Sequence, residues 1–435
     1  MDKPASRERA PAARSGALDE ILDGGLLRAV FQPIVDLETG RLFGFEALAR
    51  GPEGTALERP DRLFAVARAE DRVAELDAAC QATAVAAAKA HAITAPLTLF
   101  INVEPDAAGI GTLPIGPGSR GMIELTERAL TSRLAELLPA VQSARRQGWG
   151  IALDDIGADT RSLALMPLLR PDLIKLDMRL VQDQPTPEIA AIAGAVGAQA
   201  ERTEATVLAE GIETEEQAQY ARALGATLGQ GFLFGRPTPE PRVTEVTDIP
   251  LPIYTSALPD SWRAPFELAS ARRPVRRGTG PLLAAISREL ERQAATTKRS
   301  SLLISSFPDA ERWISHRDEI YEQGAADLAY AAVLAHGIPP EPVPGVTGIN
   351  IYEDDPLSGT WNTIVISAHF ASMLAAQAHS GADAEAEEFD FIFTYDRELI
   401  VECAQALMMR VGRQEASPRG AERRDPSAGD RRTPG

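Results

Sequence analysis

The stretch Gly150-Ile-Ala-Leu-Asp-Asp-Ile-Gly157 determines how the rest of the chain is interpreted. It begins with a short apolar run between glycines, which is typical of a buried strand. The run ends in two adjacent carboxylates, Asp154 and Asp155. Two neighbouring acids in a half-buried place do not both stay ionised unless something positive lies between them. The stretch therefore predicts a strand that ends at a divalent cation.

Other apolar runs have the same form, with a polar residue near the far end. They are Phe43-Gly-Phe-Glu46, Leu99-Phe-Ile-Asn102, Met122-Ile-Glu124, Leu173-Ile-Lys-Leu-Asp177 and Val207-Leu-Ala-Glu210. We expect these strand ends to converge on one metal site.

Predicted strands and helices alternate from residue 18 to about residue 241. The strands are 29–35, 42–47, 97–103, 121–125, 150–153, 173–176, 206–209 and 231–234. The helices are 59–70 running into 73–91, 132–147, 186–201 and 214–224. Eight strands with intervening helices predict a TIM-like (β/α)8 barrel, whose functional groups lie at the C-terminal ends of the strands. A doubly wound open sheet is the alternative, but no G-x-G-x-x-G opens a helix here.

The rest of the chain divides by composition. Residues 1–17 and 412–435 are predicted to be disordered tails, 18–242 the barrel, and 243–261 a proline-rich linker. Residues 262–411 are predicted to form a smaller α/β domain. Its predicted strands are 301–305, 346–352, 360–367 and 389–394; its helices are 281–292, 309–336 with a break near 324, 370–379 and 397–410. The turn 353–359 suggests a hairpin between the strands on either side, and Asp396 is the predicted N-cap of the last helix.

Composition excludes several classes of function. The net charge of −18 argues against a nucleic-acid polymer or an anionic membrane as the main partner. Cys80 and Cys403 form no C-x-x-C pair, and the five histidines have no zinc-like spacing. The longest Ala/Ile run, 189–200, is too short for membrane insertion. We therefore expect a soluble, cytoplasmic protein.

The polar groups at the strand ends offer oxygen ligands, which favour Mg²⁺ or Mn²⁺ over zinc or copper. They exceed what one octahedral ion needs, so two ions that share Asp154 are expected, an arrangement suited to phosphodiester hydrolysis. Lys175 is the candidate to orient the attacking water, or to remove its proton if metals and burial lower its pKa. Arg50 is placed to clamp a phosphate oxygen.

Each of these residues also has a structural interpretation. Asp154 or Asp155 alone would more often cap a helix. Lys175 and Asp177 alone suit an ion pair within the barrel equally well. Glu124 alone would be interpreted as an acid at the surface. Gln230 alone would be interpreted as a side chain that hydrogen-bonds to the backbone. Together these interpretations are less favoured, because they require many unrelated coincidences of placement.

With these residues, the sequence resembles the EAL family of cyclic di-GMP phosphodiesterases over residues 18–241. The signature is Glu46-Ala47-Leu48 followed by Arg50. The motifs around it are Phe31-Gln32-Pro33-Ile34, Asn102, Glu124-Leu125-Thr126-Glu127, Asp154-Asp155, Lys175-Leu176-Asp177, Glu210-Gly211-Ile212-Glu213 and Gln230-Gly231.

The resemblance implies a barrel that hydrolyses cyclic di-GMP to linear pGpG. The implied metal ligands are Glu46, Asn102, Glu124, Asp154, Asp155 and Glu210. The implied catalytic and supporting residues are Lys175 for water activation, with Glu210, Asp177, Gln230 and Glu213, the last steadying the loop after the Asp-Asp pair. The implied substrate contacts are Gln32 and Arg50. A homodimer through the barrel is also implied.

The loop after Asp155 departs from the family pattern, which is Asp-Asp-Phe-Gly, Thr or Ala, then Gly-Tyr-Ser-Ser. Here Ile156 and Thr160 replace the aromatic residues, and Asp159 replaces the second glycine. In the family this loop links the second metal to the dimer interface. The departure leaves open a phosphodiesterase of low or conditional rate, or a receptor that binds cyclic di-GMP without much turnover.

The second domain resembles the DICT sensory domain. The carrying features are Pro265-Phe-Glu-Leu268, Ser301-Leu-Leu-Ile-Ser-Ser306, the turn Glu353-Asp-Asp355, and Trp361. The resemblance implies a sensor that modulates the barrel, with a ligand or protein partner that the sequence does not identify. A third hypothesis is a protein-binding scaffold that works through this domain alone.

Overall fold

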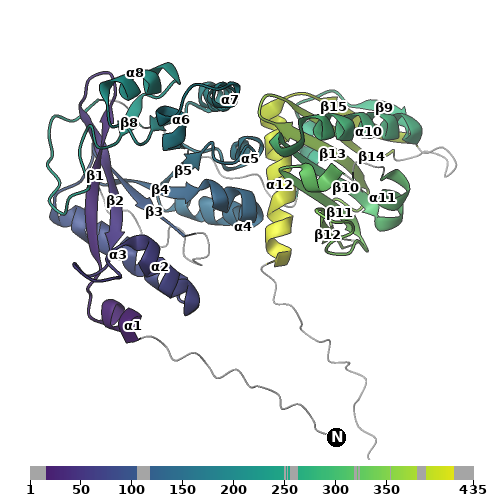
Figure 1. Ribbon diagram of the computed structural model, residues 1–435. Coiled ribbons are helices and arrows are strands. Elements are labelled where there is room, and N and C mark those ends of the chain that lie inside the picture. Colours follow the sequence, from purple (N-terminus) through teal and green to yellow (C-terminus); the bar gives the residue numbers. More distant parts are fainter. Residues whose placement is uncertain are drawn as a thin grey trace, which may run out of the picture.

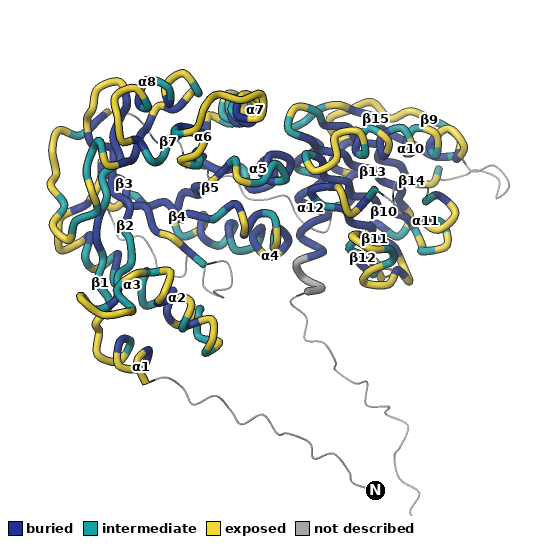
Figure 2. The backbone as a smooth tube through the Cα atoms, in the orientation of Figure 1, coloured by how far each residue is buried: buried dark blue, intermediate teal, exposed yellow. Residues whose placement is uncertain are grey.

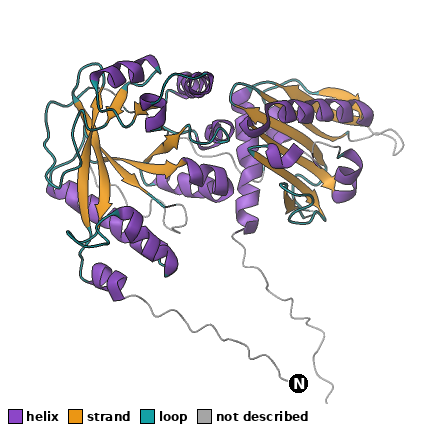
Figure 3. Ribbon diagram, in the orientation of Figure 1, coloured by secondary structure: helices purple, strands orange, loops and turns teal. Residues whose placement is uncertain are grey.

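The computed structural model describes residues 16–104, 118–248, 251, 253–254, 263–317, 321, 324–352, 354–379 and 388–415. Most of the two predicted tails, residues 1–15 and 416–435, lie outside these ranges. The described chain forms a barrel with surrounding helices, followed by an open sheet with helices on both faces (Figures 1 and 3).

The predicted closed barrel is confirmed. Its strands are β1 (Arg28–Asp36), β2 (Leu42–Arg50), β3 (Thr98–Asn102), β4 (Arg120–Thr126), β5 (Gly150–Ile156), β6 (Leu173–Leu176), β7 (Thr206–Ala209) and β8 (Leu228–Gln230). Strands β2 to β8 pair in parallel, whereas β1 is antiparallel to both of its neighbours. A short turn joins β1 to β2, and such a turn only connects antiparallel strands.

The helices of the barrel are α1 (Gly16–Asp23), α2 (Pro60–Ala69), α3 (Val73–Ala90), α4 (Glu127–Arg146), α5 (Ser162–Leu169), α6 (Met178–Gln182), α7 (Pro187–Thr203) and α8 (Glu215–Ala223). All of the predicted barrel helices are among them, whereas α1, α5 and α6 were not predicted. Helix α4 begins earlier than predicted because the side chain of Thr126 caps it, accepting a hydrogen bond from the Ala129 N–H. Helix α5 was not predicted, because all eight of its residues are buried and it has no polar face to give a helical period.

The predicted eighth strand, 231–234, is wrong. Strand β8 is the preceding segment, where Leu228 contributes to the barrel interior and Gly229 pairs with Val35 of β1. Three residues with one large apolar side chain give no detectable strand period. The aromatic residues that follow favour a strand by composition, so the prediction fell on 231–234 instead. The shift places Gln230 at the C-terminal end of its strand.

Part of the predicted linker belongs to the barrel. Val246 forms an isolated bridge with Leu42, at the start of β2. Leu251 is buried in the cluster that fills the barrel interior, and Ile253 packs against that cluster. The chain therefore closes the N-terminal end of the barrel before it enters the second unit.

The second unit is a seven-stranded sheet in the order β12-β11-β10-β13-β14-β15-β9. Its strands are β9 (Arg276–Thr279), β10 (Ser301–Asp309), β11 (Tyr330–His336), β12 (Thr347–Asn350), β13 (Thr360–Ser367), β14 (Ala371–Ala378) and β15 (Glu388–Thr394). Its helices are α9 (Pro265–Ser270), α10 (Gly280–Thr297), α11 (Ala310–His316) and α12 (Arg397–Glu415), with the 3-10 turns η1 (Lys298–Ser300) and η3 (Ala325–Asp327).

Three predictions for this unit are wrong. The second half of the predicted helix 309–336 contains β11, and the predicted helix 370–379 is β14. The predicted hairpin is absent from the described pairings, because β12 pairs with β11, and β13 pairs with β10 and β14. The alanine-rich sequence of β14 favours a helix locally, but pairing on both sides overrides that preference. The predicted cap is confirmed, since the Leu399 N–H donates to Asp396 Oδ1.

Helix α12 lies between the barrel and the second sheet (Figure 1). It contacts α4 and α5 of the barrel as well as α9, β12, β13 and β14 of its own unit. The junction is buried on both sides, around α5 and α12 (Figure 2). No helix within the described ranges is both long enough and apolar enough to span a bilayer.

Candidate active site

Carboxylates from β2, β4 and β5 and from the residue after β7 surround one buried lysine. Lys175, in β6, lies with its Nζ 2.8 Å from Glu124 Oε1, 2.9 Å from Asp154 Oδ1 and 2.6 Å from Glu210 Oε1. Glu46 Oε2 lies 3.9 Å from the same nitrogen. Parallel strands bring their carboxyl ends to one rim, so residues far apart in sequence meet there. The predicted convergence of these five residues is confirmed.

The pKa of each group in this cluster depends on the charges of its neighbours. Burial alone would lower the pKa of the Lys175 ammonium, but the surrounding carboxylates outweigh burial and raise it well above its ordinary value. The surrounding carboxylates therefore favour the protonated ammonium of Lys175. Burial raises the pKa of Glu124, and it raises that of Glu210 to about 8. For Glu46, attraction to Lys175 and hydrogen bonds overcome burial and lower the pKa.

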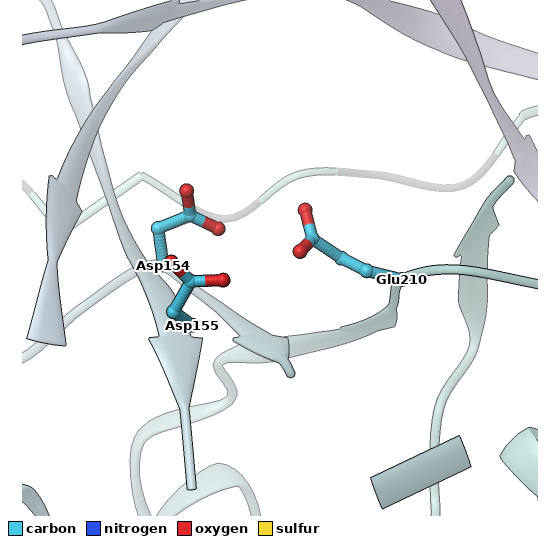
Figure 4. A group of neighbouring side chains, drawn as sticks. All are labelled: Asp154, Asp155 and Glu210. Atoms are coloured by element: carbon cyan, nitrogen blue, oxygen red, sulfur yellow. The ribbon is translucent and has the colours of Figure 1, made fainter. Parts of the chain in front are cut away.

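Asp154 and Asp155 are adjacent in β5, so a regular strand would point them to opposite faces. The register between β5 and β6 shifts at this point, and Asp155 adopts a positive φ of 59°. A bulge of this kind re-aims a side chain, and non-glycine residues in this region store strain. As a result, carboxylate oxygens of Asp154, Asp155 and Glu210 lie within 4.8 Å of one another (Figure 4). Burial, followed by repulsion from Asp154, raises the pKa of Asp155 to about 6.

The donor set fits one or more hard divalent cations. Among the described residues, the charged groups paired with Lys175 are carboxylates, whose oxygens are the preferred ligands of Mg²⁺ and Mn²⁺. Glu124 Oε2 is buried and accepts no hydrogen bond from any residue in the described ranges. A buried carboxyl oxygen without a hydrogen-bond partner calls for a bound ion or water at that position.

A chain of amides orients Glu46. Asn102 Nδ2 donates to Glu46 Oε1 at 2.7 Å, and Gln230 Nε2 donates to Glu46 Oε2 at 2.6 Å. Gln230 Nε2 also lies 3.2 Å from Gln32 Oε1, whose own amide donates to the carbonyl of Gly235. Asn102, Gln230 and Gln32 therefore join the site through Glu46, and Gln230 bonds to side chains rather than to backbone.

Other predicted residues lie further from the carboxylates. Asp177 caps α6, accepting hydrogen bonds from the backbone and side chain of Arg179. Its carboxylate still contributes to the raised pKa of Asp155. Arg50 donates to the carbonyl of Ala49 and lines a cavity beside the site. Glu213 is exposed, and its backbone N–H donates a hydrogen bond to Gln217 Oε1.

The loop after Asp155 is held by Glu127, which the sequence interpretation missed. Glu127 Oε1 accepts from the Gly157 N–H at 3.0 Å and from Ser162 Oγ at 2.6 Å. Glu127 Oε2 accepts from the Asp159 N–H at 2.8 Å. Glu127 is buried at the start of α4, and its position in the motif Glu-Leu-Thr-Glu was the available signal.

A cavity of about 430 Å³ extends from Glu46 beneath α2 and α3. Leu48 and Phe64 are among its apolar lining residues, and Asp77 lies at its wall. Asp77 is only 2 % exposed, and burial raises its pKa to about 7. Its carboxylate accepts from Gln81 Nε2 and from a backbone N–H. Asp77 was not predicted, because a single acid within a predicted helix does not indicate that the residue is buried or functional.

Comparison with protein families gives two matches. The family described as EAL domain matches residues 15–237, about half of the chain. The family described as "Sensory domain in DIguanylate Cyclases and Two-component system" matches residues 271–379. The first range falls on the barrel, and the second covers strands β9 to β14 of the second unit.

Individual relatives resemble the barrel region. A cyclic di-GMP phosphodiesterase of Pseudomonas aeruginosa, RocR, is 32 % identical over 232 residues, which are 50 % of this chain and 59 % of RocR. A second one from the same organism, NbdA, is 29 % identical over 236 residues, which are 51 % of this chain and 30 % of NbdA. The chain thus spans well under two thirds of either relative. A solved complex of Klebsiella pneumoniae BlrP1 with calcium and cy-diGMP is 31 % identical, covers 50 % of this chain and 57 % of BlrP1, and has a TM-score of 0.44.

Proposed function

This chain belongs to the EAL domain family, and from that premise we propose that it hydrolyses cyclic di-GMP to linear pGpG with two bound divalent cations, Mg²⁺ or Mn²⁺. One observation carries the proposal: carboxylates from four strand ends surround the buried ammonium of Lys175 at the mouth of a closed barrel. Glu46, Asn102, Glu124, Asp154, Asp155 and Glu210 would hold the ions. When bound, such ions lower the pKa of water and neutralise charge on the phosphate.

The chain's own residues orient the reaction. In the hydrolysis, a water oxygen bonds to phosphorus while the bond to the ribose 3′ oxygen breaks, and that oxygen takes up a proton. Lys175 Nζ lies among the proposed metal ligands, so we assign it to orienting the water and the phosphate by donating hydrogen bonds. Gln230 and Asn102 keep the Glu46 carboxylate in place. The position of Arg50 in the cavity wall suits a contact with a phosphate oxygen.

The cavity beside Glu46 suits one guanine base. Its walls are mostly apolar, as a stacked ring requires, and two of the proposed metal ligands, Glu46 and Asn102, line it. Gln32 accepts a hydrogen bond from Gln230, which also donates to Glu46, and it suits a contact with the substrate. We further propose that the second unit modulates hydrolysis. A homodimer would use a face of the barrel other than α5, because every residue of α5 is already buried within one chain.

The test is incubation of the purified full chain with cyclic di-GMP and Mn²⁺, followed by chromatography. Formation of pGpG is expected, and Glu46→Gln is expected to abolish it because a metal ligand is lost. Glu38→Gln is the matched control, since Glu38 is exposed at the β1–β2 turn. Saturable binding without product would instead support a receptor. Neither binding nor product would support a scaffold.

A further inference from the structure

Helix α5 follows directly from the loop after β5, the strand that carries Asp155, and both units of the protein cover it. On the barrel side it contacts α4 and α7. On the other side it contacts α12, β10, β13 and η1 of the second unit. All eight of its residues are buried. A helix packed in this way cannot shift against one unit without disturbing its packing on the other.

The C-terminal end of α5 is bonded by both units. The last carbonyls of a helix lack partners within that helix and need donors from elsewhere. Gln405, in α12, is buried and donates to the carbonyl of Leu168 at 2.8 Å. Arg145, in α4, donates to the carbonyl of Arg170 at 2.6 Å. The second unit therefore supplies part of the cap of a barrel helix.

An ion pair strengthens this junction. Arg170 Nη1 lies 2.9 Å from Glu398 Oε2 at the start of α12. Arg170 ends α5 in a left-handed conformation, with a φ of 46°. The chain direction after α5 is thus defined at a residue that the second unit contacts directly.

The N-terminal end of α5 is bonded to the loop of the active site. Ser162, the first residue of α5, donates to Glu127, which also accepts from the Gly157 and Asp159 amides. Asp155 precedes Gly157 by two residues. Arg299, in η1 of the second unit, acts electrostatically on Asp159. A series of hydrogen bonds joined by the backbone of α5 therefore runs from α12 to Gly157, two residues after the strained Asp155.

We propose that α5 couples the second unit to the metal-binding loop, so that a displacement of α12 changes the affinity of the site for divalent cations. Asp159, which departs from the family pattern, lies in the coupled loop together with its ion-pair partner Arg161. This regulation acts on the proposed active site and rests on the proposed function only for its effect on turnover. The coupling itself is a difference in binding free energy, which is measurable without hydrolysis.

The test uses the full chain with Gln405→Leu, which keeps the bulk of the side chain but removes the donor to Leu168. The first readout is hydrogen–deuterium exchange of residues 155–163, and the second is Mn²⁺ titration by calorimetry. We expect loop exchange to rise about tenfold or more and the Kd for Mn²⁺ to change about fivefold or more, since coupled sites typically differ 5–150-fold. Glu402→Gln is the control, because Glu402 lies on the same helix but pairs with Arg272 inside the second unit. It is expected to leave both quantities within about twofold of the parent.

Unchanged exchange and unchanged Mn²⁺ affinity in folded Gln405→Leu would overturn the proposal, as would equal changes in the Glu402→Gln control. If Gln405→Leu does not fold, Glu398→Gln takes its place, because it removes only the ion pair with Arg170. It is expected to change both quantities in the same direction by a smaller factor, and no change would again overturn the coupling. A parent protein that binds Mn²⁺ and shows the coupling but forms no pGpG would contradict the proposed function alone.

Discussion

Lys175 Nζ lies 2.6 Å from Glu210 Oε1, so the buried cation of β6 is paired with the acid that follows β7. The same ammonium also bridges Glu124 and Asp154, and it partly balances carboxylates that would otherwise repel one another. Removal of one partner from a buried charge network is strongly destabilising. Divalent cations would relieve the same repulsion, which connects the stability of the protein to its metal content.

Mn²⁺ is therefore expected to stabilise the folded protein. A ligand at 100 times its Kd contributes about 2.7 kcal/mol to the free energy of unfolding. Thermal unfolding with EDTA and with Mn²⁺ should show a higher Tm with the metal. In Asp154→Asn and Glu210→Gln this increase should largely disappear. Glu216→Gln, an exposed change on α8, is the control and should keep it. Equal increases in all four proteins would contradict the metal site.

Glu127→Gln is expected to weaken the loop after Asp155. The amide group of glutamine presents donors to the Gly157 and Asp159 amides, which themselves need acceptors. We expect pGpG formation to fall roughly 10- to 100-fold if the loop positions Asp155, because small misplacements of reacting groups have effects of this order. The measurement is kcat/KM at saturating Mn²⁺. Glu136→Gln, on an exposed part of the same helix, should stay near the parent rate.

Asp77 should make stability fall as pH rises. Its pKa is about 7 in the folded state, above the ordinary value of 3.8, so the unfolded chain loses this proton first. The stabilisation is complete below pH 4 and is lost as pH rises to 7, at no more than about 1.4 kcal/mol per pH unit. Urea unfolding in EDTA at pH 5 and pH 7.5 should show a smaller decrease for Asp77→Asn than for the parent. An identical decrease would show that Asp77 does not carry the proton.

Leu251→Ala is expected to destabilise the barrel although the residue follows the last barrel strand. Leu251 is 7 % exposed and packs into the cluster that fills the barrel interior. Truncation of a buried leucine typically lowers the free energy of unfolding by roughly 2–5 kcal/mol. Urea unfolding provides the measurement. Val243→Ala, at an exposed position earlier in the same segment, should change it by less than about 0.5 kcal/mol.

The predictions for the barrel succeeded where local patterns were strong. Apolar runs that end in an acid identified β4, β5 and β6, and the alternation with helices implied a closed barrel. The predictions failed at β8 and α5, because a three-residue strand and a wholly buried helix carry no period. In the second unit, β14 has a composition that favours a helix, and only its pairing with β13 and β15 makes it a strand.

The sequence by itself determined which residue types stand at the strand ends, and thus the oxygen-rich chemistry of the site, because strand ends are marked locally by apolar runs. Only the tertiary structure decided that Lys175 lies at the centre of these acids as a cation, since its charge depends on residues from four other strand ends. It also decided that Glu127 holds the loop after Asp155 and that Gln405 caps α5. These contacts join segments up to 237 residues apart, and no local pattern encodes a distance of that kind.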